Sequence, residues 1–325
     1  MSEQNTGTTS SIGAAWPPVA DNHNRLRGFY DEGVVDSNQA AQDFANQWHE
    51  ARQRMATHPT CNRLSIRAVA KPALLATLEQ LGVAVEAALP LAAPYDSLVV
   101  TYTGYNAPDR VMSEAHTTRH ISALHHATAQ SRRSTHPANF SLEPGFSSAF
   151  VDQNSSTAER QGLASQFAGL YAIFGYSADE TKTLLSNPDN MIAYIKHNGD
   201  VVSTAMAECG TIPIKNLATL TIAEITEAST APAYRGKGLY KAVSGMLTRR
   251  LIASRDLAAI YGESNLAMPG VLIAAHHNGR RFSHFDGAAY GIVKPSFGIL
   301  PQNFSVQDGV ETRAHNDFAV SYIPL

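Results

Sequence analysis

The stretch from Thr221 to Leu251, TIAEITEASTAPAYRGKGLYKAVSGMLTRRL, constrains the fold more than any other part of this chain. Its first half is rich in the β-branched residues of a strand, and its second half has an apolar face at helical spacing. Between the two halves stands Arg-Gly-Lys-Gly, at residues 235–238. The segment therefore predicts a strand that turns through a glycine-rich loop directly into an amphipathic helix.

A turn of this kind is suited to bind an anion. Glycines let backbone N–H groups face a ligand without a Cβ in the way, and the start of a helix adds a partial positive charge at the same place. Arg235 and Lys237 carry charges of the same sign. The loop therefore predicts a site for a diphosphate group.

Two other phosphate-binding motifs fit this segment less well. The chain has no G-x-x-x-x-G-K-[ST] sequence, which excludes a Walker loop. A Rossmann fingerprint is also not met, because Gly236-Lys237-Gly238 is followed by Lys241 where a third glycine is needed. On this motif alone, an ordinary strand–turn–helix with incidental glycines stays open as the alternative.

The same residues resemble the GNAT acetyltransferase superfamily, which carries [R/Q]-x-x-G-x-[G/A] at this turn. Arg235 to Leu239 match its first five positions, and Tyr240 stands where a small residue is usual. The resemblance implies an α/β (α+β) fold with a central mixed, mostly antiparallel sheet flanked by helices. It also implies acetyl-CoA, or another acyl-CoA, as co-substrate. The residues implied to hold it are Ser229, Thr230, Arg235, Gly236, Lys237, Gly238, Leu239, Tyr240 and Asn265.

Around residues 205–240 the chain looks closest to one subgroup, the β-lysine N6-acetyltransferases. Ala207-Glu208 and the run Ala223–Pro232 resemble its acidic strand pair, and Asn62–Tyr105 resembles the small α/β piece in front of it. After Tyr261 the sequence diverges. The resemblance implies acetyl transfer to the primary amine of a small amino acid or diamine.

Three glutamates are candidates for the catalytic base, in the order Glu227, Glu224 and Glu208. A lysine-type amine has a pKa of about 10.4, so it arrives charged and must lose a proton before it attacks a thioester. Glu224 and Glu227 fall on opposite faces of a regular strand, unless the bulge that the resemblance implies intervenes. A backbone N–H near Ser229 would hold the thioester carbonyl.

The group that would protonate the leaving thiolate stays open. Many GNAT enzymes place a tyrosine on the helix after the next strand, but the helix expected near Met268–Asn278 contains none. His276 and His277 lie at its end, where exposed histidines are the simpler interpretation. Tyr261 and Tyr290 lie outside it.

The remaining pattern predicts a flexible arm over 1–24, a smaller N-terminal α/β domain with a His-rich connector over 25–150, and a GNAT domain over 151–325. Helical spacing predicts a helix from Ser37, and Asn198-Gly199 predicts a hairpin. We expect strands near Arg63–Val69 and Leu98–Tyr102 with a helix at Pro72–Leu81 between them.

Composition narrows the function. Hydrophobic residues make up 44% of the chain and charged residues 16%, and the net charge is −3. There is no basic stripe for nucleic acid and no apolar run of membrane-spanning length. Two cysteines cannot form a disulfide framework. We therefore expect a cytoplasmic protein that binds a small-molecule amine, not nucleic acid or membrane, and leave a homodimer open.

We expect no metal site. His116, His120, His125 and His126 cluster in the connector, but the residues between His116 and His120 lack the Glu of a metalloprotease motif. Two alternatives to the acetyltransferase stay open. One is a non-catalytic GNAT-like module that binds CoA or a partner protein. The other is an N-acyltransferase with a longer acyl donor or an unusual amino-acid acceptor in a biosynthetic pathway.

Overall fold

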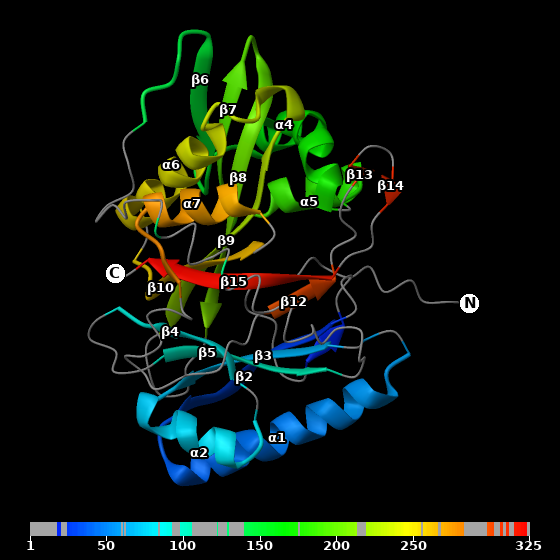
Figure 1. The fold of residues 1–325 in the computed structure, drawn as a ribbon, viewed down its shortest axis with the longest axis vertical. Coiled ribbons are helices and arrows are strands. Elements are labelled where there is room, and N and C mark those ends of the chain that lie inside the picture. Colours follow the sequence, from blue (N-terminus) through cyan, green and yellow to red (C-terminus); the bar gives the residue numbers. More distant parts are fainter. Residues whose placement is uncertain are drawn as a thin grey trace.

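Two β-sheets face each other, and each carries helices of its own (Figure 1). The computed structural model describes residues 18–20, 25–59, 61, 63–83, 85–92, 98–105, 122, 129, 140–174, 176–212, 219–254, 256–265, 268–282, 298–301, 306–307, 310–311 and 315–323. The first sheet is called the N-terminal sheet here and the larger one the C-terminal sheet.

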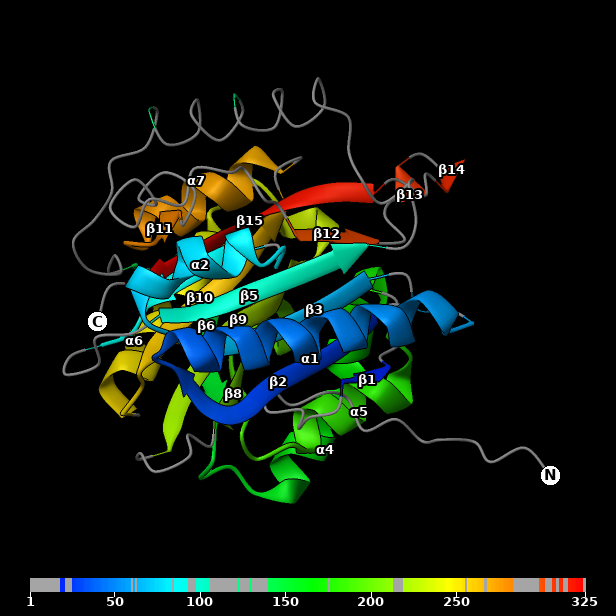
Figure 2. The same cartoon turned by 90° about the horizontal axis from the view of Figure 1, so that it is seen from below.

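The N-terminal sheet has the strand order β1-β2-β3-β5-β4. Its strands are β1 (Val19–Ala20), β2 (Arg25–Val35), β3 (Arg63–Ala70), β4 (Val85–Pro90) and β5 (Leu98–Tyr105). Its helical segments are α1 (Asn38–Thr57), η1 (Pro72–Leu74) and α2 (Leu75–Gln80). Seen from below, α1 and α2 cover the sheet face that points away from the C-terminal sheet (Figure 2).

Helix α1 confirms the prediction from spacing. The Ser37 side chain accepts a hydrogen bond from the Ala40 amide and so caps the helix. One stripe of the helix is buried on the sheet: Ala41, Phe44, Ala45, Trp48, Ala51 and Met55.

Gly82, with φ +79°, follows α2 as a C-cap glycine should. Strands β2 and β4 were not predicted, and β1 lies inside the expected arm.

The C-terminal sheet has eight strands in the order β11-β15-β10-β9-β8-β7-β6, with β12 paired to β15. Its strands are β6 (Phe146–Val151), β7 (Met191–His197), β8 (Asp200–Ile212), β9 (Leu220–Thr230), β10 (Ala259–Asn265), β11 (Arg281–Phe282), β12 (Gly298–Pro301) and β15 (His315–Ile323). A separate pair is β13 (Val306–Gln307) with β14 (Val310–Glu311). Within this sheet, β9 and β10 pair in parallel and the other described pairs are antiparallel.

Helices flank both faces of the C-terminal sheet. Helices α4 (Thr157–Tyr171) and α5 (Ala178–Ser186) share a buried cluster with Tyr194 and Met206, whereas α6 (Leu239–Ser254) shares one with Ala193 and Ala205. Helix α7 (Pro269–His277) lies beside α6. The expected fold class, a mixed and mostly antiparallel sheet flanked by helices, is confirmed.

The two sheets meet through an apolar layer. Phe29, Val69 and Leu89 from the N-terminal sheet pack against Leu220, Ile222, Tyr261 and Tyr322 of the C-terminal sheet. The Ala92 amide donates to the Ala258 carbonyl at 2.8 Å, so main chain also crosses the contact. This layer brings β3 against the face of β9 and β10.

The predicted hairpin between β7 and β8 and the predicted N-cap of α5 are both present. Asn198 (φ 51°) and Gly199 (φ 93°) form the predicted hairpin turn between β7 and β8. Ser177 caps α5 in a reciprocal pair with Glu180. The expected domain boundary near residues 150–151 falls within β6, which belongs to the C-terminal sheet.

Some predictions lie outside the described residues. These are the four connector histidines at 116, 120, 125 and 126, together with Tyr290. Within the described part of the chain, no group of His, Cys, Asp or Glu is placed to hold a metal ion. The helices described there include none with the length and apolar character needed to cross a membrane.

Candidate functional site

Strands β9 and β10 separate at their carboxyl ends. Their parallel pairing runs from Ile222 opposite Ala259 to Ile225 opposite Gly262. Beyond that pair β9 continues to Thr230 and β10 to Asn265 without further pairing between them. We call this point the fork. Carboxyl ends of parallel strands are a common place for ligands in α/β proteins.

A β-bulge lies in β9 immediately past the fork. Thr204 pairs with Ser229 but Met206 pairs with Thr226, so β9 has one residue more than β8 over this interval. Glu227 lies in the bulge with φ 31°, in the left-handed region. A non-glycine residue there is strained, and such strain concentrates at functional sites. The bulge that the resemblance implied is therefore present.

The bulge changes where Glu227 points. Its Oε1 accepts a hydrogen bond of 2.8 Å from the hydroxyl of Tyr176, which precedes α5. The buried Tyr171 lies nearby, with its hydroxyl 3.4 Å from that of Thr204. Burial raises the pKa of Tyr171, and the negative charge of Glu227 raises it further. Glu227 therefore faces the α4 and α5 side of the sheet.

Glu224 is bound across the contact between the two sheets. Its Oε2 accepts hydrogen bonds from Arg67 Nη2 at 2.9 Å and from the Tyr261 hydroxyl at 2.7 Å. The Arg67 guanidinium also lies 5.2 Å from the centroid of the Tyr261 ring. All three residues are buried. A carboxylate engaged in this way is a weaker candidate for a base that must exchange protons.

Glu208 lies in β8 directly opposite Glu224. Cross-strand partners share a face of the sheet, so both carboxylates point to the same side. Like charges in this position repel each other, and of the two carboxylates Glu224 is paired with Arg67. Glu208, Glu224 and Glu227 thus all lie on the face turned toward α4, α5 and the N-terminal sheet.

The loop after β9 has the predicted glycine geometry. After the short helix η4 (Pro232–Tyr234), Gly236 has φ 79° and Gly238 has φ 74°. A Cβ added at either glycine would meet no atom within 4 Å, so both face open space. Among the described residues, the amides of residues 236–241 donate to no backbone carbonyl, and the first such bond runs from Ala242 N to Gly238 O at 3.0 Å.

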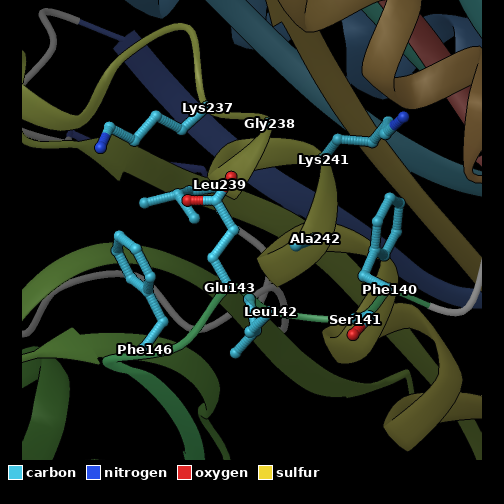
Figure 3. A pocket seen from close by; sticks show the side chains of 10 residues that line it. All are labelled: Phe140, Ser141, Leu142, Glu143, Phe146, Lys237, Gly238, Leu239, Lys241 and Ala242. Carbon is cyan, nitrogen blue, oxygen red and sulfur yellow. The ribbon is translucent and has the colours of Figure 1, made fainter.

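A pocket of about 200 Å³ lies at this helix start (Figure 3). It is lined by Phe140, Ser141, Leu142, Glu143, Phe146, Lys237, Gly238, Leu239, Lys241 and Ala242. Lys237 and Lys241 stand at opposite sides of it (Figure 3). Lys237 Nζ lies 5.9 Å from the centre of the Phe146 ring, and Lys241 Nζ lies 5.1 Å from that of Phe140. The segment 140–146 was missed because it was interpreted as part of the connector.

Of the predicted cofactor residues, Lys237, Gly238 and Leu239 line this pocket, and the others do not. Arg235 is exposed and its Nε donates to the Thr230 carbonyl at 3.3 Å. Thr230 Oγ1 lies 2.8 Å from Ser203 Oγ, and Ser229 is buried. Tyr240 is half-buried; burial raises the pKa of its hydroxyl, and the charge of Arg280 opposes that rise.

Asn265 ends β10, and its side chain lies outside the described residues. Helix α7 holds no tyrosine, as expected from the sequence. His276 and His277 lie in its last turn. Burial lowers the pKa of His277, and the charge of Lys241 lowers it further. The positions of these two histidines do not identify the residue that would protonate a leaving group.

No protein-family model matches the chain, and no curated protein matches it significantly. The chain is similar to a GCN5-related N-acetyltransferase structure from Kribbella flavida, with 16% identity over 73% of this chain and 70% of the other, and a TM-score of 0.36. A GNAT-family acetyltransferase from Streptococcus pneumoniae is 9% identical over 55% and 98% of the two chains, with a TM-score of 0.37. Arabidopsis thaliana NAA60, in complex with acetyl-CoA, is 9% identical over 55% and 97%, with a TM-score of 0.35. These likenesses are distant, and none of them bears on the β-lysine subgroup.

Proposed function

We propose that this chain is an acyl-CoA-dependent N-acyltransferase of the GNAT type. It would transfer an acetyl group from acetyl-CoA to the primary amine of a small amino acid or diamine by direct attack. The observation that carries the proposal is the row of amides at residues 236–241, which meets no described backbone acceptor and lies where a pocket opens at the start of α6.

The diphosphate of the co-substrate fits this site on chemical grounds. The amides that meet no backbone acceptor among the described residues lie at the start of α6, where the helix adds a partial positive charge. The lysines 237 and 241 line the same pocket, and Arg235 is exposed next to the loop. Open space at Gly238 lets an anion come close to the main chain.

Glu227 is the base that we prefer. It lies in the bulge just past the fork, so its carboxylate is near the place where an acyl group bound along β9 would end. Tyr176 fixes one of its oxygens. Glu227 would take the proton of the incoming ammonium, and a backbone N–H near Ser229 would polarise the thioester carbonyl.

The acidic face supports a cationic acceptor. Glu208 and Glu227 lie on the same side of the sheet as the Arg67–Glu224 pair, so the net charge of this group of four side chains is negative. A negative field attracts an alkyl ammonium group and favours its binding. The resemblance to the β-lysine subgroup supports a small amino acid or diamine, and we keep cytoplasmic location as a prediction from composition.

Thermal shift followed by thiol release tests the proposal. We expect CoA and acetyl-CoA each to raise the Tm, and a panel of small amines to release free CoA thiol from acetyl-CoA. Stabilisation without thiol release from any amine supports the CoA-binding module instead. Release that needs a longer acyl-CoA supports the alternative donor. If neither CoA nor acetyl-CoA changes the Tm, every CoA-dependent function is excluded.

A further inference from the structure

The pocket at the start of α6 contains an acidic side chain, although it is the place where we propose that an anion binds. Glu143 lines this pocket together with Lys237, Gly238 and Leu239. Its side chain points from its own segment toward the turn at Gly238 and Leu239, and in this view its carboxylate lies between the two lysines of the pocket (Figure 3). A carboxylate and a diphosphate repel each other at short range. The presence of Glu143 here therefore bears on which anions the pocket can hold.

A rigid turn holds the backbone of Glu143. The Phe146 amide donates to the Glu143 carbonyl at 3.1 Å, and Pro144 and Gly145 lie between the two residues. Gly145 has φ 88°, as the third residue of a type II turn requires, and proline is favoured at the second position of such a turn. The turn therefore directs the carboxylate from a fixed backbone, and little backbone freedom has to be lost to place it at the pocket.

Apolar side chains fasten the same segment to α6. Phe140, Leu142 and Phe146 pack against the buried cluster that includes the start of this helix. A Cβ added to Gly245 of α6 would lie only 3.0 Å from the Phe140 ring, so ring and helix are in close contact. Glu143 lies between these apolar anchors and is itself exposed. The segment is thus held on the core by its apolar residues, while its carboxylate faces the pocket.

The carboxylate does not neutralise the lysines of the pocket. No ion pair joins Glu143 to Lys237 or Lys241. Lys237 Nζ lies 5.9 Å from the ring centres of both Phe146 and Tyr234, and Lys241 Nζ lies over the other phenylalanine ring of the segment. A lysine held on an aromatic ring keeps its charge. A bound anion would therefore be attracted by the two lysines and repelled by Glu143.

We propose that Glu143 is a specificity-determining residue, which raises the Kd of every anion that binds at the start of α6. The proposal rests on the proposed function, in which a diphosphate binds there. A small anion such as inorganic diphosphate has only the loop amides and the lysines to hold it, so the repulsion keeps its occupancy low. CoA gains further contacts through its pantetheine arm and still binds. Glu143 thus keeps small phosphate anions from competing with the co-substrate.

A contact between Glu143 and the nucleoside of CoA would have a different signature. A carboxylate that accepted a hydrogen bond from the adenine amino group would strengthen the binding of CoA, and its removal would weaken that binding. Inorganic diphosphate has no base, so its affinity would not report such a contact. The two ligands share only the diphosphate, and a comparison of their affinities therefore isolates the effect of charge at the helix start.

Glu143→Gln tests the proposal, since it removes the charge and keeps the shape of the side chain. We expect the Kd of CoA and the Kd of inorganic diphosphate to fall by the same factor, about two- to tenfold at low salt. Calorimetry measures the first, and displacement of CoA by inorganic diphosphate gives the second. Glu50→Gln is the matched control, because Glu50 is an exposed glutamate of α1, on the other sheet, and its loss changes the net charge equally.

Salt gives a second readout of the same variant. The gain in affinity should shrink as the salt concentration rises, because salt screens charges across an open pocket. A gain that persists at high salt would come from shape and not from charge, and it overturns the proposal. An unchanged or larger Kd of CoA in Glu143→Gln overturns it too. So does a gain for CoA that inorganic diphosphate does not share.

The wild-type protein separates this inference from the proposed function. If wild type binds CoA and releases thiol but Glu143→Gln binds CoA no more tightly, only the role of Glu143 is lost. If wild type neither binds CoA nor releases thiol with any amine, the function itself fails before any variant is made.

Discussion

The two halves of strand β9 differ in how completely their polar groups are satisfied. The first half, from Leu220 to Ile225, is paired with β8 on one side, with β10 over most of its length on the other, and packs on the N-terminal sheet. The second half, from Thr226 to Thr230, pairs only with β8 and bulges at Glu227. It leads into a loop whose amides meet no backbone acceptor among the described residues. The first half therefore contributes more to stability, and the second half is where we propose that the ligands bind.

The charged groups follow the same division. In the first half, Glu224 is enclosed by Arg67 and Tyr261. In the second half, Glu227 is held through one oxygen by Tyr176 at a strained backbone position. The first glutamate joins the two sheets, and the second is the one that we propose as the base. Each of the substitutions below should therefore act mainly on one of three properties, namely folding stability, CoA binding or turnover.

Arg67→Met should have the largest effect, and it should act on stability. Removing one partner of a buried ion pair leaves Glu224 charged and buried, which costs about 3–5 kcal/mol of unfolding free energy. Chemical denaturation measures the loss. Arg52→Met is the control, because Arg52 is an exposed arginine that also lies over a ring, 5.0 Å from the centre of Trp48.

The double variant Arg67→Met with Glu224→Gln sharpens this result. It removes both charges, so it should recover most of the lost stability. If the double variant also has a kcat close to the wild-type value, Glu224 is not the base. A double variant that is as stable as wild type but inactive would instead restore Glu224 as a catalytic candidate.

Glu227→Gln should act on turnover. Without a carboxylate to accept the amine proton, kcat should fall by at least about 10²-fold, or about 2.7 kcal/mol. The Kd for CoA and the Tm should stay near the wild-type values, because the amide has nearly the same shape. Steady-state kinetics and calorimetry measure the two quantities. Unchanged turnover would exclude Glu227 as the base.

Gly238→Val should weaken CoA binding. The valine side chain enters space that is open in the free protein, where the diphosphate is expected, so we expect at least about a tenfold rise in Kd, or 1.4 kcal/mol. Gly199→Val is the matched control, because Gly199 also has positive φ (93°) and open space around it. Both variants should lose a similar amount of stability from backbone strain, but only Gly238→Val should lose affinity for CoA.

The sequence predicted local features of β9 and its loop better than their surroundings. Gly236 and Gly238 were predicted from their spacing after a strand, and both have the positive φ that makes glycine necessary. Strand β2 was missed because Gly28, Asp31 and Gly33 interrupt its alternation, and pairing with β3 compensates for poor propensity.

Contacts between distant segments could not be predicted in this way. Arg67 and Glu224 are 157 positions apart, and nothing local to either residue indicates the other. Arg280 is a similar case, because its position depends on a glycine in β10 and a serine in α6. Periodicity reports which face of an element is apolar, but not which element meets it.

Tyr176→Phe should have the smallest effect, and it asks how firmly the second half of β9 must hold Glu227. The variant removes the hydroxyl that lies 2.8 Å from Oε1. A single hydrogen bond contributes about 0.5–1.5 kcal/mol, so kcat should fall about two- to tenfold with the Kd for CoA unchanged. Tyr194→Phe is the control, since its ring lies in the same α4 cluster at 5.7 Å from Phe167. Equal losses of kcat in the two variants would mean that the packing of the cluster, and not the hydrogen bond to Glu227, affects turnover. The second half of β9 would then be less specialised for catalysis than we propose.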